Sequence, residues 1–304
     1  MLYMRRRQAL VDLLAMSRFA NLPTVWSNAL LGGMLGLVFA KLDLLLDPLR
    51  FIQVFLSPSL LYLGGCFFND WHDLDFDRKT RPDRPLPSGR WQRRTVFALA
   101  GGLMALGLIL SFFLSLASGY CGLGIVGCIL VYTRWHKRSL VSLLFMAGAR
   151  VLIYPLAALA FLPLTSAQES IALFVFLALG MGGYILGISL SARRETASKA
   201  ERRENILPVL LLISPAIIFS APLLTLGYTF AVIPLIFFIA LLALIVRQFR
   251  STGQVGRFVS YTLAMIPFVD WLIMAPLAPS LPILLLPPIL ACLAFFLQRI
   301  APAT

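Results

Sequence analysis

Long runs of apolar residues, separated by short polar stretches, fill most of the chain. Each run is close to the length of roughly 20 residues that a helix needs to cross the apolar layer of a bilayer. The runs are too long and continuous for the strands of a membrane barrel, so they predict helices. We count ten, with nine as the alternative because the last four are rich in proline, near residues 22–40, 51–69, 95–117, 119–133, 139–163, 169–192, 206–225, 228–246, 258–277 and 279–299.

This pattern predicts an all-α polytopic integral membrane protein, a bundle of 9–10 transmembrane helices forming a single domain over residues 1–304. Composition agrees, because 60% of the residues are hydrophobic and only 13% are charged, whereas about a quarter are charged in a typical soluble domain. An ordinary soluble protein and a disordered chain are excluded. The cysteines lie within apolar runs, without the spacing of a zinc site or a disulfide framework: Cys66, Cys121, Cys128 and Cys292.

The net charge of +13 is distributed in a way that predicts membrane topology. Of the 26 Lys and Arg residues, 23 lie in the N-terminal segment, in alternate connections or at the C-terminus, while Lys41 and Arg50 lie in the opposite connection and Arg150 within an apolar run. The positive-inside rule then places both termini and the long polar loops in the cytoplasm. We expect a bacterial cytoplasmic membrane, contact with membrane lipids and no nucleic-acid partner. The opening segment lacks a small-residue cleavage site, so we do not expect it to be a cleaved signal.

The most informative polar stretch is GGCFFNDWHDLDFDRKTRPDRPLPSG, residues 64–89. If the second helix continues through it at about 100° per residue, Asn69, Asp70, Asp73 and Asp77 share one face. So much negative charge on one face is unfavourable without a cation, and Mg²⁺ prefers oxygen ligands of this kind together with substrate phosphates. We therefore expect these four residues to hold Mg²⁺ and a phosphorylated substrate.

Basic residues follow directly, around prolines that end the helix and stiffen the turn. Guanidinium groups can clamp phosphate oxygens in a bidentate manner, whereas the alternative is that these residues only set topology. The group comprises Arg78, Lys79, Arg81, Arg84 and Arg90.

NDWHDLDFD followed by RPDRPLPSG resembles the first aspartate-rich motif of the UbiA superfamily of intramembrane prenyltransferases, with Asn69, Asp70, Asp73 and Asp77 at its positions and residues 84–89 as its tail. RFANLPTVWSNALLGG, YTRWHKR and MAGARVLIYPLAAL look like the same family, so the resemblance covers most of the chain.

The resemblance implies a helical bundle around a central cavity that opens to lipid. It implies that aspartates hold Mg²⁺, that the metal binds a polyprenyl diphosphate, and that a lipophilic, often aromatic, acceptor captures the prenyl cation. It also implies catalytic roles for Asp70, Asp73, Asp77 and Arg84, and substrate binding by Arg18, Asn21 and Lys137. Tyr132 matches the same element as Lys137, and the alternative is an interface tyrosine and a topology lysine. Arg81 is expected to bind substrate as one of the basic residues that follow the motif.

The chain departs from the family in the loop after the sixth apolar run, which usually carries a second acidic motif of the DxxxD type. Here it reads SLSARRETASKAERREN, similar to a loop in a bacterial branch encoded by the ebo gene cluster. Two outcomes are open. In the first, Arg193 and Arg194 neutralise the diphosphate, and Glu195 either orients them or serves as a lone metal ligand. In the second, the protein binds a lipid phosphate without ionising it.

Three polar residues within apolar runs add further candidates. Arg150 either contacts a substrate phosphate or carboxylate, or pairs with Asp270 or a carbonyl to join helices. Asp270 either lines the acceptor end of the cavity or pairs with a basic residue. Asn28 is expected to join helices by hydrogen bonds.

The sequence thus predicts a Mg²⁺-dependent enzyme that moves a polyprenyl group from its diphosphate to a lipophilic acceptor. Three other functions remain: transfer of a phosphorylated sugar onto a polyprenyl phosphate, lipid-phosphate binding or transport on the same fold, and a structural membrane subunit, which the intact acidic face disfavours.

Overall fold

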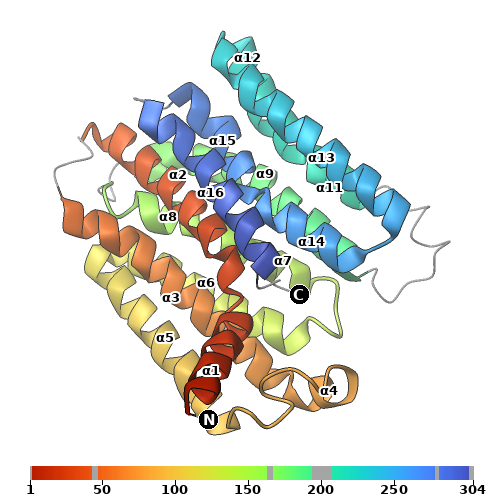
Figure 1. Cartoon of the computed structure of the whole chain (residues 1–304). Coiled ribbons are helices and arrows are strands. Elements are labelled where there is room, and N and C mark those ends of the chain that lie inside the picture. Colours follow the sequence, from red (N-terminus) through yellow and green to blue (C-terminus); the bar gives the residue numbers. More distant parts are fainter. Residues whose placement is uncertain (1, 43–46, 163–166, 194–206, 278–280, 301–304) are drawn as a thin grey trace.

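A computed structural model describes the chain except residues 1, 43–46, 163–166, 194–206, 278–280 and 301–304 (Figure 1). Its described residues form helices and no strand, which confirms the all-α prediction. The helices are α1 Leu2–Met16, α2 Leu22–Ala40, α3 Pro48–His72, α4 Leu74–Thr80, α5 Arg93–Leu114, α6 Leu116–Trp135, α7 Ser142–Val151, α8 Ile153–Ala158, α9 Ala167–Arg193, α11 Leu207–Pro215, α12 Ala221–Thr225, α13 Val232–Thr252, α14 Val255–Ala264, α15 Ile266–Leu277 and α16 Leu281–Ile300.

Two of the predicted membrane crossings form the centre of the bundle. In the apolar stretches of Phe19–Ala40 and Val255–Leu277, 83% and 89% of the residues are buried inside the protein. In the other long apolar helices of the described chain, the share of buried residues is 22–44%. Those outer helices carry large exposed apolar side chains such as Phe113, Ile217 and Phe230. Such surface is stable only against lipid, so the chain is an integral membrane protein.

The described chain contains nine helices that are long and apolar enough to cross a membrane, and the interrupted pair α7–α8 forms a shorter apolar segment, Ser142–Ala158. Arg193, at the end of α9, donates to Ser139 O (2.8 Å) just before α7. At the other end, Arg50, which lies at the start of α3, donates to Ala160 O (3.2 Å) just after α8. The pair therefore runs between the two ends of the bundle, as the count of ten predicted. Pro155 explains the interruption at Leu152, because its ring clashes with the carbonyl one turn earlier.

Glycines bring α2 and α8 into close contact at the centre. A Cβ atom built on Gly32 would lie 2.5 Å from Tyr154 O, and one on Gly36 would collide with Ala158 O. Small residues one turn apart are the usual means by which membrane helices approach this closely. The backbone contact fixes α7–α8, and with it the side chains that α7 presents, against α2.

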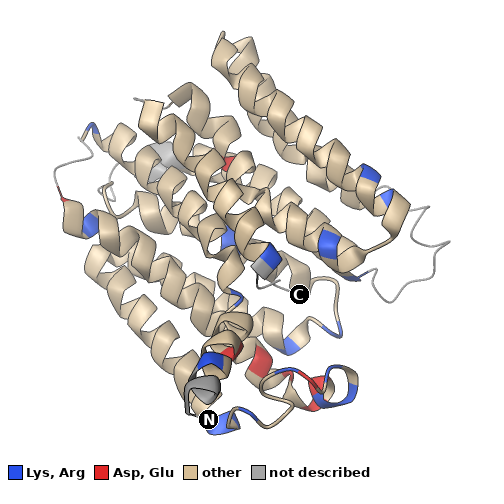
Figure 2. Ribbon diagram, in the orientation of Figure 1, with Lys and Arg blue, Asp and Glu red and all other residues tan. Residues whose placement is uncertain are grey.

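The N-terminal helix α1 lies outside the predicted crossings and packs beside the acidic stretch (Figure 1). Its Asp12 is bound by Arg90 through Nε (2.9 Å) and Nη2 (3.2 Å). Met16 belongs to a small apolar cluster with Phe67 and Leu86. Arg90, expected as a phosphate clamp or a topology charge, thus joins α1 to the loop after α4. Figure 2 shows acidic and basic residues gathered at this end of the bundle.

Candidate functional site

The acidic stretch is not one continuous helix. The chain leaves helical geometry at Asp73 (φ −83°, ψ 0°), so α3 ends at His72 and α4 begins at Leu74. The prediction of an uninterrupted helix through residues 69–77 was therefore wrong, although Asp73 and Asp77 are buried while Asp75 is exposed. The break turns Asp73 toward the chain after α6 while backbone bonds from Asp73 N to Asn69 O (2.9 Å) and from Asp77 N to Asp73 O (2.8 Å) keep the turn compact.

Each carboxylate of the motif faces a different cation. Arg18 Nη2 contacts Asp70 Oδ1 at 3.1 Å, and Arg84 Nη1 contacts Asp77 Oδ2 at 2.9 Å. These cations come from the turn before α2 and from the loop after α4, two separate parts of the chain. The structure thus joins two of the predicted binding residues to the acidic motif.

Asp73 is held by the chain that follows α6. Lys137 Nζ donates to its Oδ1 (2.6 Å) and His136 Nε2 lies 3.3 Å from its Oδ2. Burial alone would raise the pKa of Asp73, but the hydrogen bonds from His136 and Lys137 outweigh burial and lower it to about 2. Lys137 also lies over the Phe76 ring (3.9 Å to the centroid). His72, which the helical projection placed off the acidic face, lies 3.4 Å from Asp73 Oδ1.

His136 was missed from the sequence. It stands in YTRWHKR beside the chosen Lys137, but nothing in that segment reveals that Asp73 lies opposite. Its ring stacks on Tyr132, with centroids 5.1 Å apart. Tyr132 in turn lines the cavity described below.

Arg18 adopts a left-handed backbone conformation (φ 46°, ψ 45°) that few residues other than glycine adopt. The conformation ends α1 and turns the chain into α2. Burial opposes the charged form of Arg18, but the attraction of Asp70 outweighs it, and the pKa of the guanidinium lies above its ordinary value. Tyr62 OH donates to Arg18 O (3.3 Å) from α3.

The acidic motif offers oxygen donors for a divalent cation. Asn69 Oδ1 is buried and, among the described residues, has no hydrogen-bond partner. A buried carbonyl oxygen without a donor is costly unless a ligand completes it. In the part of the chain that the structure describes, no three His, Cys, Asp or Glu side chains converge on one point, because each carboxylate is drawn to its own cation. Carboxylate and amide oxygens are ligands that fit Mg²⁺. For the ion to bind, Arg18, Arg84 and Lys137 would have to release the carboxylates.

A cavity of about 310 Å³ opens beside the motif. Its α3 wall comes from one helical face, Pro58, Tyr62, Gly65, Cys66 and Asn69. Its remaining walls include five isoleucines of α6, α8 and α9: Ile125, Ile129, Ile153, Ile185 and Ile188. Among the predicted substrate-binding residues, Arg18, Asn21 and Arg150 line it. An apolar chamber with charged groups at one end suits an amphipathic ligand.

The polar residues of the central helices form a hydrogen-bonded network. Asp270 accepts from Ser27 Oγ (2.5 Å), Asn28 Nδ2 (2.8 Å) and Tyr154 OH (2.6 Å). Asn28 therefore joins helices as predicted, and Asp270 is bound by neutral donors. Arg150 donates to Thr24 Oγ1.

The other predicted binding residues have different surroundings. Asn21 Oδ1 accepts from Gln298 Nε2 (2.6 Å) of α16 while also lining the cavity. Arg193 donates to the carbonyls of His136 and Ser139, so it braces the segment that carries Lys137; its direct contact with substrate stays a prediction. Arg81 is exposed where α4 ends. Arg194 and Glu195 lie outside the described residues.

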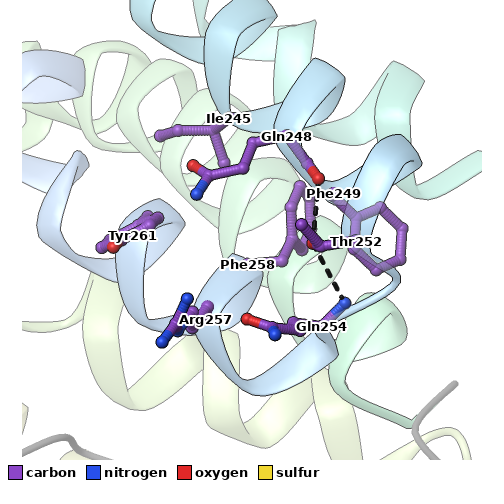
Figure 3. Close-up of a pocket in the computed structure, with 8 residues that line it drawn as sticks. All are labelled: Ile245, Gln248, Phe249, Thr252, Gln254, Arg257, Phe258 and Tyr261. Atoms are coloured by element: carbon purple, nitrogen blue, oxygen red, sulfur yellow. Dashed lines mark hydrogen bonds between the residues drawn. The ribbon is translucent and has the colours of Figure 1, made fainter.

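A second pocket, between α13 and α14, is only about 10 Å³ (Figure 3). Thr252 Oγ1 donates to Gln248 O (2.9 Å) beside it, and Arg257 is its one cationic lining residue. Its size excludes it as a substrate site.

Several relatives share parts of this sequence. The chain is 44% identical over 66 residues to the digeranylgeranylglyceryl phosphate synthase of Metallosphaera sedula, and this match covers 22% of this chain and 23% of that protein. It is 37% identical over 115 residues to the protoheme IX farnesyltransferase of a Synechococcus species (36% and 34%). The chain thus spans about a quarter to a third of the length of these two relatives. With the protoheme IX farnesyltransferase of Oceanobacillus iheyensis it shares 24% identity over 216 residues (66% and 68%).

Solved structures share the fold. A UbiA homolog from Aeropyrum pernix K1 superposes with a TM-score of 0.65 at 15% identity, covering 83% of this chain and 96% of that one. A UbiA homolog from Archaeoglobus fulgidus bound to DMAPP and Mg²⁺ gives a TM-score of 0.50 at 16% identity (95% and 99%). The model of the UbiA prenyltransferase family matches residues 29–255. Since this match covers well over half of the sequence and the helices repeat the family's fold, the chain belongs to the UbiA prenyltransferase family.

Proposed function

We propose that this protein is a Mg²⁺-dependent intramembrane prenyltransferase that moves a polyprenyl group from a polyprenyl diphosphate to a lipophilic acceptor. One observation carries the proposal: three carboxylates and the partnerless Asn69 carbonyl gather where an apolar cavity ends, each carboxylate facing a cation. The relatives named as a protoheme IX farnesyltransferase and a digeranylgeranylglyceryl phosphate synthase, and the fold neighbour bound to DMAPP and Mg²⁺, support it.

Asn69, Asp70, Asp73 and Asp77 are the residues that would hold the metal. When bound, Mg²⁺ would neutralise the diphosphate and make it a better leaving group. The cations that face the carboxylates, Arg18, Lys137 and Arg84, lie where they can turn to diphosphate oxygens as the metal takes over the carboxylates. The C1–O bond of the donor breaks, pyrophosphate leaves, and the acceptor bonds to C1 and loses a proton. The isoleucine-rich walls exclude water from the allylic cation.

We infer that the whole chain forms one domain in a bacterial cytoplasmic membrane, with the acidic motif facing the cytoplasm. The concentration of Lys and Arg at the end of the bundle that holds the motif supports this orientation.

The test uses the full chain in nanodiscs and a mixture of prenyl diphosphates of different length, with pyrophosphate release as the signal. Release should need Mg²⁺ and fall by about 100-fold or more in Asp73→Asn and Asp77→Asn. Asp75→Asn is the matched control, because its side chain is 76% exposed and contacts Arg78 outside the cavity. Unchanged release in Asp73→Asn and Asp77→Asn contradicts the proposal.

Two alternatives have distinct outcomes in the same assay. Metal-dependent binding of the diphosphate without release would indicate a lipid-phosphate carrier, which the altered second acidic motif favours. Consumption of a sugar pyrophosphate with polyprenyl phosphate as acceptor would indicate a phosphosugar transferase.

A further inference from the structure

Arg150 is a half-buried cation that the donor site does not use. It lies in the last turn of α7 and lines the central cavity. Its guanidinium has five N–H donors, and in the described structure one hydrogen bond, to Thr24 Oγ1, engages it. No described carboxylate lies within ion-pair distance. A charge in this position is costly, so it requires a functional or structural reason.

Asp270 is the carboxylate that interacts with Arg150 electrostatically, but it does not supply that reason. Its two oxygens already accept three hydrogen bonds from Ser27, Asn28 and Tyr154. Asp270 therefore reduces the cost of burying Arg150 without occupying the guanidinium. The unused donors of Arg150 remain available to a ligand in the cavity.

Arg150 lies deeper in the bundle than the acidic motif. Helix α7 starts at Ser142, beside the carbonyls that Arg193 binds at the motif's end of the bundle. Eight residues of helix then carry the chain about 12 Å inward before Arg150. The donor diphosphate has three other cations beside the carboxylates, so a group held by Arg150 belongs to a different part of the reaction.

We propose that Arg150 binds an anionic group, a carboxylate or a phosphate monoester, on the acceptor, at a subsite separate from the diphosphate. This inference rests on the proposed function, since it names the chemistry of the second substrate. Thr24 positions Arg150: its hydroxyl accepts from the guanidinium and donates to Asn21 O (2.7 Å). An acceptor anchored there has its apolar body beside Ile125 and Ile153 and presents its nucleophile toward the motif.

The test measures binding of three probes of one shape to the full chain in nanodiscs: 2-naphthoate, 2-naphthyl phosphate and the neutral 2-naphthamide. Neither donor nor Mg²⁺ is present, and empty nanodiscs correct for partition into lipid. Wild type should bind at least one of the two anions about tenfold or more tightly than the amide, because a charge-assisted bond forms. The preferred anion distinguishes a carboxylate from a phosphate acceptor.

Arg150→Met should remove the preference and leave the affinity for 2-naphthamide within twofold, whereas Arg150→Lys should keep part of it. Arg50→Met is the control, because Arg50 contacts Ala160 O and Asp47 at the opposite end of the bundle. Equal affinities for all three probes in wild type, no binding at all, or an undiminished preference in Arg150→Met would overturn the proposal.

The two proposals fail separately. If wild type shows no preference for the anionic probes but still releases pyrophosphate, only the role of Arg150 is overturned. An Arg150-dependent preference without any release overturns only the prenyltransferase proposal. If Arg150→Met does not fold, the Arg150→Lys and Thr24→Val variants test the proposal instead. Each should lower the affinity for the preferred anionic probe and leave the affinity for 2-naphthamide unchanged.

Discussion

Lys137 makes a contact that the sequence did not predict. It was expected to reach a diphosphate, which stays a prediction, and in the structure its Nζ donates to Asp73 Oδ1 (2.6 Å). Lys137 would therefore compete with a bound metal for Asp73 and would become available to the substrate once the metal held that carboxylate. The same exchange applies to Arg18 and Arg84, which hold the other two carboxylates.

Replacing Lys137 with Met should therefore have opposite effects on the two ligands. Without donor, Mg²⁺ affinity should rise by about threefold to tenfold, because a competing cation is gone. Affinity for a prenyl diphosphate in the presence of Mg²⁺ should fall by a similar factor. Calorimetric titration in nanodiscs measures both, with the neighbouring exposed Arg138→Met as control. A fall in both affinities would contradict the exchange.

The lowered pKa of Asp73, about 2, predicts a pH window for stability. In the unfolded chain the carboxyl titrates at about 3.9, so the ion pair stabilises the fold fully above that pH. The contribution is lost as the pH falls from there through the folded value. In chelator-containing buffer, the difference in melting temperature between wild type and Asp73→Asn should stay constant from neutral pH down to about pH 4 and shrink only below it. A difference that does not shrink as the pH falls below about 4 would mean that the pKa of Asp73 is not lowered in the folded protein.

Single residues of the site could be predicted from the sequence, but their partners could not. Asn69, Asp70, Asp73 and Asp77 were recognisable from spacing, since i to i+4 periodicity is a local property. The pairing of Asp73 with His136, and of Asp270 with Ser27, joins residues 63 and 243 positions apart, and a single sequence carries no signal for such pairs.

Among the elements, α2 and α7–α8 position the cavity. Helix α2 carries Asn21 at its N-terminal boundary and Thr24 in its first turn, and α7 ends at Val151, directly after Arg150. Their close approach depends on Gly32 and Gly36. The apolar pattern predicted both segments, but it could not predict the interruption at Leu152 or which faces meet.

Substituting Gly32 with Ala should destabilise the protein by about 1–3 kcal/mol, because the new methyl group would lie 2.5 Å from Tyr154 O, a backbone atom that cannot rotate away. Gly101→Ala is the control, since a Cβ there meets no atom within 4 Å. Thermal unfolding in detergent compares them. Equal melting temperatures for the two variants would show that α2 and α8 have room to separate.

At the scale of the whole molecule, the turn after α2 and the acidic motif lie at opposite ends of α3, so we expect them on opposite sides of the membrane. Ser88→Cys, in the loop after α4, should react with a membrane-impermeant maleimide only from the cytoplasmic side. Lys41→Cys should react only from the other side. Inverted and right-side-out vesicles distinguish the two, with wild type as the background for the four native cysteines. Labelling of both positions from one side would refute the topology.

Composition and charge placement were sufficient to predict the class, the helical architecture and the membrane setting. They did not predict that α1 packs on the acidic stretch, because its contacts through Asp12 and Met16 depend on Arg90, Phe67 and Leu86, which follow much later in the chain. A polar, weakly periodic segment at the start of a membrane protein gives no indication of what it will cover.

The bonds between the first and last helices also have a consequence for biosynthesis. Ser27 and Asn28 donate to Asp270, Asn28 also donates to Tyr154 OH (2.9 Å), and Asn21 accepts from Gln298. The carboxylate pairs with Arg18 and Arg84 require only the first 84 residues, so this half of the site can assemble while the ribosome is still making the rest. The bonds that Ser27 and Asn28 make to Asp270, and that Asn21 makes to Gln298, form only when the final helices enter the bilayer. Release from the insertion machinery before then would expose these groups to lipid, so the last two helices act as the closing step of assembly.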